Sequence, residues 1–154
     1  MSHIERRIAE LGLSLPEQWQ PRGMFLPWRM AGNIIYLSGQ ICERNGAVVL
    51  AGPVGNSVST DEARAAAEIC ALNLLYNLKQ ACGDLDRVTE IIRLGGFVNC
   101  VPQFPDAPKV VDGASELFIK LYGEAGRHVR TAVGVAGLPA NAAVEVDAIV
   151  RVGE

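Results

Sequence analysis

The side chains best suited to chemistry lie near the end of the chain, in two segments with the alternating pattern of β-strands, Val129–Val135 and Ala143–Val152. The first segment contains Arg130, and the second contains Glu145 and Asp147. Successive side chains of a strand point to opposite faces of a sheet, and we expect the apolar positions of both segments to lie beneath covering helices. Arg130, Glu145 and Asp147 are then expected together on the other face.

The same alternation assigns each side chain of the two segments to a face. In the first segment, the covered face is expected to hold Val129, Thr131, Val133 and Val135, and the other face His128, Arg130, Ala132 and Gly134. In the second, the covered face is expected to hold Val144, Val146, Ala148 and Val150, and the other face Glu145, Asp147, Ile149 and Arg151. One side of the sheet is therefore predicted to be core, and the other to mix charges with small residues.

Arg130 has two interpretations in this setting. It can form an exposed ion pair with Glu145 or Asp147, which is commonplace on a strand. It can also belong to a binding site, since a guanidinium beside small residues can hold a carboxylate through two parallel hydrogen bonds. A neighbouring carboxylate could then orient a water molecule or take its proton. The alternation of side chains does not distinguish these interpretations.

The other reactive side chains do not predict a metal site. The four cysteines are Cys42, Cys70, Cys82 and Cys100. No two have the spacing of a zinc-binding pair and no histidine pair lies near them, so we expect reduced, packed thiols and no metal. His128 could titrate on the Arg130 face, or it could be a hydrogen-bonded residue at a strand edge. Trp19 and Trp28 are expected to pack rather than to react.

Composition and charge exclude several classes of protein. The 154 residues fit one domain, and 49% hydrophobic with 20% charged residues is ordinary for a globular protein. A net charge of −3 without a Lys/Arg cluster argues against a nucleic-acid partner. Met1–Arg7 carries charges where a secretory signal needs an apolar core, and no apolar run approaches the roughly 20 residues that span a bilayer. We expect a soluble, cytoplasmic protein with no membrane partner.

The N-terminal segment is predicted to add a helix and an arm to the domain. Ser2 and Glu5 have the spacing of a capping box and indicate a short helix that ends at Gly12. The following stretch, up to Gly23, contains two prolines and indicates an extended arm. We therefore expect one domain over residues 1–154, with the helix and arm in residues 1–23 and the core in residues 24–152.

The core elements that must position the charged residues follow one another in a clear order. The expected strands before the closing pair are Met24–Met30, Asn33–Leu37, Ala47–Leu50 and Val88–Cys100. The expected helices run from the capping box of Ser59 and Glu62 to about Cys82, and from Pro105–Pro108 to Gly123. Gly95-Gly96 in the long strand indicates a bulge or a close backbone approach. The order predicts an α+β fold, a mixed sheet with two helices on one face.

Two of these segments resemble the signatures of the RidA (YjgF) family. Arg130–Pro139 followed by Val144–Ile149 resembles the C-terminal signature, and Ile35–Ile41 resembles the other. The resemblance covers about residues 24 to 152 and implies a chorismate-mutase-like fold and a homotrimer with clefts between subunits. The N-terminal helix and arm, with Gly126-Arg127-His128, resemble a longer, less characterised branch.

The resemblance also implies a reaction without metal or cofactor. Active relatives hydrolyse 2-imino acids and enamines to 2-keto acids and ammonia in a cleft between subunits. In that reading Arg130 and Glu145 are the catalytic residues, Arg130 clamping the substrate carboxylate and Glu145 placing or activating water. The remaining residues implied to bind the substrate are Phe25, Ser38, Gly39, Asn99 and Cys100.

Two departures from the family pattern leave a second function open. Phe25 stands where deaminating relatives carry a tyrosine, and Ala132 where a cysteine is common. Phe25 could line the cleft, or it could be a core or interface aromatic. The alternative is a non-catalytic trimer that binds a small carboxylate metabolite. An endoribonuclease fits poorly, because the chain is acidic and has no histidine pair.

Overall fold

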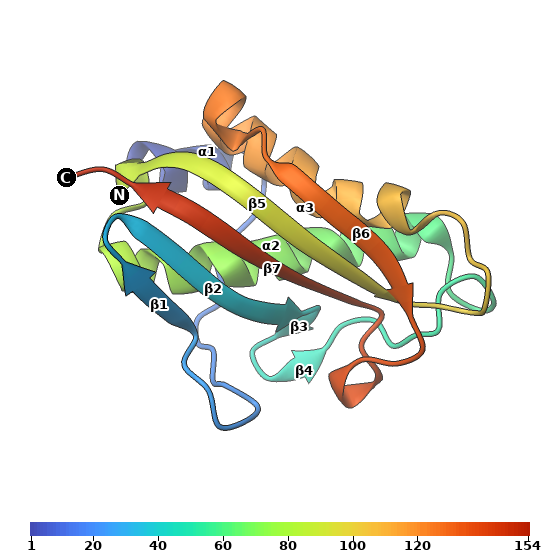
Figure 1. Cartoon of the computed structure of the whole chain (residues 1–154). Helices are drawn as coiled ribbons and strands as arrows, with labels where there is room; N and C mark the ends of the chain where they lie inside the picture. The colour runs from blue at the N-terminus through green and yellow to red at the C-terminus, as the bar shows by residue number, and fades with distance from the viewer.

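The computed structural model describes residues 1–154 and contains one five-stranded sheet (Figure 1). Its strands are β1 (Trp28–Ala31), β2 (Ile34–Ile41), β5 (Val88–Asn99), β6 (Val129–Val135) and β7 (Val144–Val152). They lie in the order β1-β2-β7-β5-β6. β5 and β6 run parallel and the other neighbours antiparallel, so the sheet is mixed, as predicted.

Two helices, α2 (Thr60–Cys82) and α3 (Ala107–Tyr122), cover one face of the sheet. Figure 1 looks onto the uncovered face, with both helices behind the strands. α2 begins where it was predicted, because the Ser59 side chain accepts the Glu62 amide and the Glu62 side chain returns to the cap. It ends at Gly83, whose φ of 82° suits a residue without a side chain.

The helices and the sheet enclose the core. β7 follows the predicted alternation, since Val144, Val146, Ala148 and Val150 are all buried. The helices approach each other closely at Gly113, where an added Cβ would lie 2.0 Å from the Arg64 carbonyl oxygen. The predicted close approach at Gly95-Gly96 is also present. A Cβ on Gly96 would lie 2.4 Å from a Val111 methyl group of α3.

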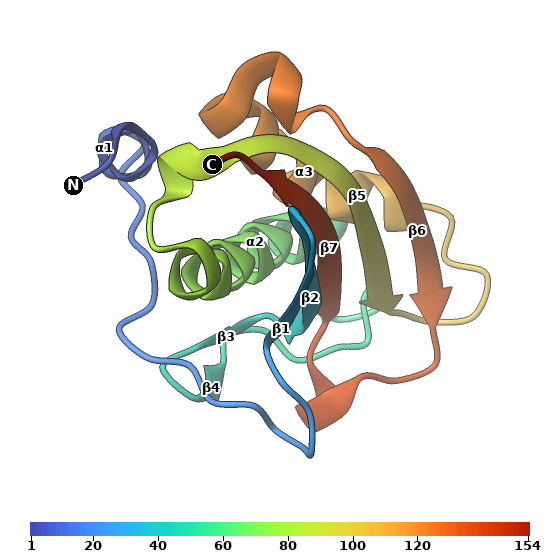
Figure 2. The same cartoon turned by 60° about the vertical axis from the view of Figure 1, so that its left-hand side comes forward.

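The N-terminal helix α1 (His3–Glu10) has the predicted capping box, formed by Ser2 and Glu5. The Asp86 carboxylate accepts the His3 and Ile4 amides at 2.8 and 2.9 Å, attaching α1 to the 3₁₀ turn Leu85–Arg87. Figure 2 shows the chain leaving α1, passing α2 and reaching the hairpin of β3 (Glu43–Arg44) and β4 (Ala47–Val48) before β1.

The first strands differ from the prediction. β1 starts only at Trp28, because residues 13–27 form a longer arm than expected. β2 continues to Ile41 through a bulge between Leu37 and Gln40. The predicted strand Ala47–Leu50 is reduced to β4, which pairs with β3 in a separate hairpin instead of joining the sheet. Further 3₁₀ turns occupy Gly123–Gly126 and Pro139–Asn141.

The predicted faces of β6 are wrong. Arg130 is in register with Leu94, which is fully buried beneath the helices, so Arg130 lies on the helix side. Val129 and Val133 lie on the open face and are 66% and 41% exposed. The cause is the position of β6 at the sheet edge beside α3, where a polar side chain can reach the polar groups of that helix. Glu145 faces the open side, in register with Phe97, so Arg130 and Glu145 lie on opposite faces.

Candidate functional site

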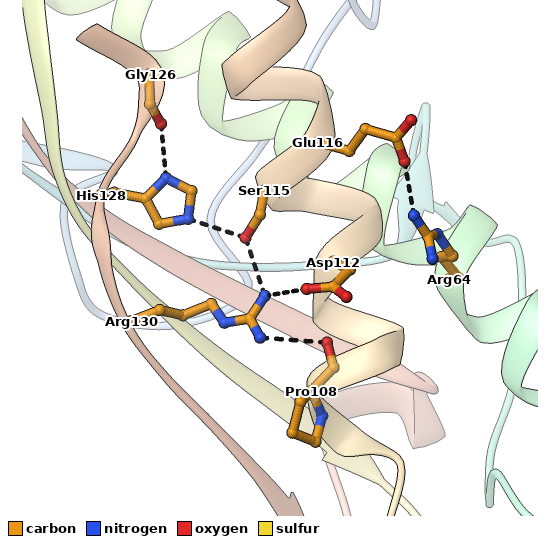
Figure 3. A network of polar contacts seen from close by, with 8 residues as sticks. All are labelled: Arg64, Pro108, Asp112, Ser115, Glu116, Gly126, His128 and Arg130. Carbon is orange, nitrogen blue, oxygen red and sulfur yellow. Dashed lines mark hydrogen bonds and ion pairs between the residues drawn. The ribbon is translucent and has the colours of Figure 1, made fainter. Parts of the chain in front are cut away.

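Arg130 is held by α3 in a network of polar contacts (Figure 3). Its Nη1 lies 2.7 Å from Asp112 Oδ1 and donates to Ser115 Oγ at 3.1 Å, while Nη2 donates to the Pro108 carbonyl at 3.3 Å. The ion pair expected with Glu145 or Asp147 is absent, and Asp112 is the partner instead. Three of the five N–H groups of the guanidinium are used, which leaves Nε and one N–H of Nη2 for a ligand.

His128, directly before β6, completes this network. Its Nδ1 lies 2.7 Å from the Gly126 carbonyl oxygen, and its Nε2 lies 2.9 Å from Ser115 Oγ. Because a carbonyl only accepts, we assign the proton to Nδ1, so that the neutral Nε2 accepts the Ser115 hydroxyl. Burial lowers the pKa of His128, and the positive charge of Arg130 lowers it further, against an opposing effect of the Gly126 hydrogen bond. The neutral ring therefore orients Ser115 toward Arg130.

A cavity of about 370 Å³ opens beside Glu145 on the other side of the sheet. Its lining comes from the arm (Trp19, Arg22, Phe25), from β2 (Ser38, Gly39, Gln40, Ile41) and from Glu43, Pro139 and Glu145. Burial raises the pKa of the half-buried Glu145 carboxyl, and the nearby Asp147 raises it further. A carboxylate of raised pKa in a cavity is suited to proton transfer.

Gly39 and Ser38 shape this cavity. A Cβ on Gly39 would lie 2.4 Å from Glu145 Oε2, so any larger residue here would displace the carboxylate from its place over β2. Ser38 Oγ donates to the Leu26 carbonyl at 2.6 Å, and its amide donates to the Pro27 carbonyl at 2.9 Å. Ser38 thus ties the end of the arm to β2. The structure places Phe25, Ser38, Gly39 and Glu145 around one cavity.

Asn99 and Cys100 lie elsewhere in this chain. The buried Asn99 amide donates to Asn141 Oδ1 at 3.0 Å and to the Ala142 carbonyl at 3.1 Å, which holds the turn before β7. Cys100 lines a separate cavity of about 590 Å³ at the ends of β5 and β6. All four cysteines are free, and three of them are buried.

Several residues of these sites were not identified from the sequence. Arg22 of the arm donates from Nε to Glu43 Oε2 at 2.7 Å, and the Glu43 side chain is only 7% exposed. No sequence pattern relates these two residues, which come together only because the arm passes the hairpin. Asp112 and Ser115 are three residues apart on α3, a spacing that places them on one helix face and that the sequence does display.

Two further observations complete the survey of the chain. No three His, Cys, Asp or Glu side chains gather closely enough to hold a metal ion. None of the helices combines the length and apolar character needed to cross a membrane.

Comparisons with known proteins agree on one family. The family described as "YjgF/chorismate_mutase-like, putative endoribonuclease" matches residues 5–150. Protein TCP17 of Trypanosoma cruzi is 39% identical over 149 residues, which are 96% of this chain and 93% of that protein. A 2-iminobutanoate/2-iminopropanoate deaminase of Dermatophagoides farinae is 30% identical over 138 residues, 90% of this chain and 93% of that one.

Solved structures show the same fold. A protein of unknown function from Agrobacterium tumefaciens superposes with a TM-score of 0.91 at 44% identity, covering 97% of this chain and 92% of that one. RidA from a Psychrobacter species gives a TM-score of 0.58 at 22% identity, with 90% and 94% of the two chains covered. This chain therefore belongs to the RidA (YjgF) family and has its chorismate-mutase-like fold.

Proposed function

We propose that this protein hydrolyses reactive 2-imino acids and enamines to 2-keto acids and ammonia, without metal or cofactor. The observation that carries the proposal is the Glu145 carboxylate in its cavity, with raised pKa and with room left by Gly39. The relative named as a 2-iminobutanoate/2-iminopropanoate deaminase supports the same reaction.

The reaction requires few catalytic groups. A protonated 2-imino acid already has an electrophilic carbon, so the site must position a water molecule and accept its proton. Glu145 takes a proton from the water as the oxygen bonds to the imine carbon, giving a tetrahedral amino alcohol. Glu145 then gives this proton to the nitrogen, the C–N bond breaks as the C=O bond forms, and the hydroxyl proton passes to the departing ammonia, which leaves as ammonium. Water is consumed and no oxidant or reductant is needed.

We propose that the site is completed by a second subunit in a homotrimer. Arg130 and Glu145 lie on opposite faces of one sheet, so one chain cannot hold a small substrate between them. β6 is an edge strand with an unpaired outer side, and the open face carries exposed Tyr36, Val129 and Val133. In this arrangement Arg130 of the partner subunit meets the Glu145 cavity and holds the substrate carboxylate with its remaining N–H groups.

Release of 2-keto acid and ammonia from imines, made in situ by an amino-acid oxidase, tests the reaction. We expect wild type to accelerate release over buffer, and Arg130→Ala and Glu145→Gln each to lose most of the acceleration. Arg151→Ala is the matched control, because this arginine, like Arg130, lies on a strand and pairs with a carboxylate, Glu90 of β5 at 2.6 Å, but lies outside both sites. Unchanged turnover in Arg130→Ala would contradict its role.

Mixing the two inactive variants tests whether the site is shared. Arg130→Ala and Glu145→Gln chains, unfolded and refolded together in equal amounts, form mixed trimers. Some interfaces then combine an intact Arg130 with an intact Glu145, and random assembly in a cyclic trimer restores roughly a quarter of wild-type turnover. A site within one subunit would give no recovery.

The alternative function is a trimer that binds a small carboxylate metabolite without converting it. Two observations favour it: Phe25 at the Glu145 cavity has no hydroxyl, and Asp112 already neutralises Arg130. It predicts thermal stabilisation by 2-keto acids without turnover of any imine. Phe25→Tyr distinguishes two causes of inactivity. It restores turnover if the site lacks only the hydroxyl, and it has no effect if the site is built for binding alone.

A further inference from the structure

The cavity beside Glu145 is larger than the smallest 2-imino acids require. Its volume is about 370 Å³. This is within the range of roughly 300–1,000 Å³ for pockets that hold drug-sized ligands, whereas an imino acid with a methyl side chain has only about six non-hydrogen atoms. The reacting atoms must lie near Glu145, so the remaining room is available to the substrate's side chain.

This room is bounded by aromatic residues of the N-terminal arm. The Trp19 and Phe25 rings line the cavity, with centroids 6.5 Å apart and planes tilted by 59°. Aromatic groups pack favourably at such distances and angles, and a third ring or a branched aliphatic group can contact both. Pro139 and Ile41 add further apolar surface to the lining.

The arm is attached to the rest of the chain on both sides of these rings. Before Trp19, the Glu17 amide donates to Asn45 Oδ1 at 3.2 Å. Between the rings, Arg22 is bound to Glu43 of β3, and after Phe25 the Leu26 carbonyl accepts the Ser38 hydroxyl at 2.6 Å. The cavity wall formed by the arm is therefore built into the fold before a ligand arrives.

The charges of this wall cancel. Arg22 is the only cation among the lining residues, and the buried Glu43 offsets its charge, so this pair gives the wall no net positive charge to attract an anionic side chain of a ligand. A second carboxylate on the substrate would find no unpaired cation here and would face Glu145. The lining therefore favours a side chain that is large, uncharged and apolar.

We propose that the arm forms a side-chain subsite and that the protein selects 2-imino acids, and the corresponding 2-keto acids, with aromatic or other large apolar side chains. The choice of imino acids rests on the proposed function, while the selection of 2-keto acids can be measured without turnover. The keto or imine carbon lies beside Glu145, and the side chain packs against Trp19 and Phe25.

Calorimetric binding of phenylpyruvate and pyruvate to the assembled protein tests the subsite. We expect phenylpyruvate to bind wild type about tenfold more tightly or better, because its ring buries apolar surface against the arm. Trp19→Ala should lose most of this preference and leave pyruvate affinity within about twofold. Trp19→Phe should keep the preference for phenylpyruvate, because it retains an aromatic ring at this position of the arm. Met24→Ala, an arm residue that is fully exposed and outside the lining, should match wild type.

Equal affinity of wild type for the two keto acids, or an equal loss of both in Trp19→Ala, would overturn the subsite. Turnover of the imines of phenylalanine and alanine is measured in parallel to separate the two proposals. Selective binding of phenylpyruvate with no turnover refutes the reaction and supports the subsite. Turnover of the alanine imine without preference for the larger ligand supports the reaction and refutes the subsite.

Discussion

At the scale of single residues, Arg130, Ser115 and His128 form a chain of hydrogen bonds in which each residue donates to the next. Arg130 donates to Ser115, and Ser115 donates to the neutral ring of His128. The His128 ring can accept this bond only without a proton on Nε2, and its lowered pKa favours that form. A protonated ring would also add positive charge beside Arg127 and Arg130, which line the same small pocket. His128 is thus a positioning residue for Arg130.

Stability should depend on pH through His128. Its folded pKa is lower than the ordinary 6.5, so its contribution is fully present above that pH and is lost as the pH falls through the folded pKa. His128→Gln keeps an acceptor for Ser115 without a titrating group. We expect its melting temperature to fall less than that of wild type between about pH 7.5 and about pH 5. His3→Gln, at the exposed second histidine, is the control, and a decline in His128→Gln equal to that of wild type would refute this role.

Asp112 should weaken the binding of carboxylates at Arg130. Its charge offsets that of the guanidinium, and both side chains are partly exposed, at 46% and 21%. Asp112→Asn keeps an oxygen acceptor and removes the charge, so we expect pyruvate affinity to rise about two- to fivefold, the usual size of such pair energies. Glu90→Gln, which removes the charge beside Arg151, should leave the affinity unchanged. Calorimetry measures both, and weaker binding by Asp112→Asn would show that the charge itself positions Arg130.

At the scale of elements, close approaches hold the helices and strands in place. α2 and α3 touch at Gly113, and α3 touches β5 where Val111 lies on Gly96. These contacts set the height of α3 above the sheet, and α3 carries Asp112 and Ser115. The position of Arg130 therefore depends on glycines in other elements.

Gly113→Ala should force α2 and α3 apart. Its Cβ would lie 2.0 Å from the Arg64 carbonyl oxygen, a backbone atom that can move only with its helix. Overpacking of this kind costs about 1–3 kcal/mol or more, which outweighs the gain of about 1 kcal/mol from replacing a helical glycine. We expect the melting temperature to fall by several degrees. Gly137→Ala is the control, because no atom lies within 4 Å of its added Cβ, and equal melting temperatures would contradict the clash.

At the scale of the whole molecule, the face of the sheet that no helix covers combines exposed apolar side chains with partly buried carboxyl groups. It carries exposed apolar side chains of β2 and β6 together with Glu145 and Asp147, whose pKa values burial already raises in the single chain. Cover by neighbouring subunits would bury this face and bring the two separated sites together. Assembly and activity should then be lost together.

Val133→Glu should prevent assembly without unfolding the chain. Val133 is 41% exposed on the open face, so a carboxylate there can be solvated in a separate subunit but not in an interface. We expect light scattering to report a smaller species with unchanged circular dichroism and no turnover. Val49→Glu places the same charge at a valine that is 48% exposed outside the sheet and should assemble normally. A fully assembled Val133→Glu protein would exclude this face from the interface.

The local elements could be predicted from the sequence because their signals lie within a few residues. The capping boxes of Ser2 and Ser59 place the starts of α1 and α2, and the alternation in β7 identifies its buried face. The motifs around Arg130 and Glu145 indicated the family that the comparisons then showed. Each of these depends on neighbouring residues or on one continuous motif.

What only the tertiary structure decided depends on contacts between distant segments. Alternation divides β6 into two faces, but the position of α3 beside this edge strand determines which face receives Arg130. In the same way, Arg22 and Trp19 enter the Glu145 cavity because the arm pairs with Glu43, and no spacing in the sequence encodes that contact. Local sequence patterns predict which side chains share one face of an element. The packing of distant elements decides which other residues that face contacts.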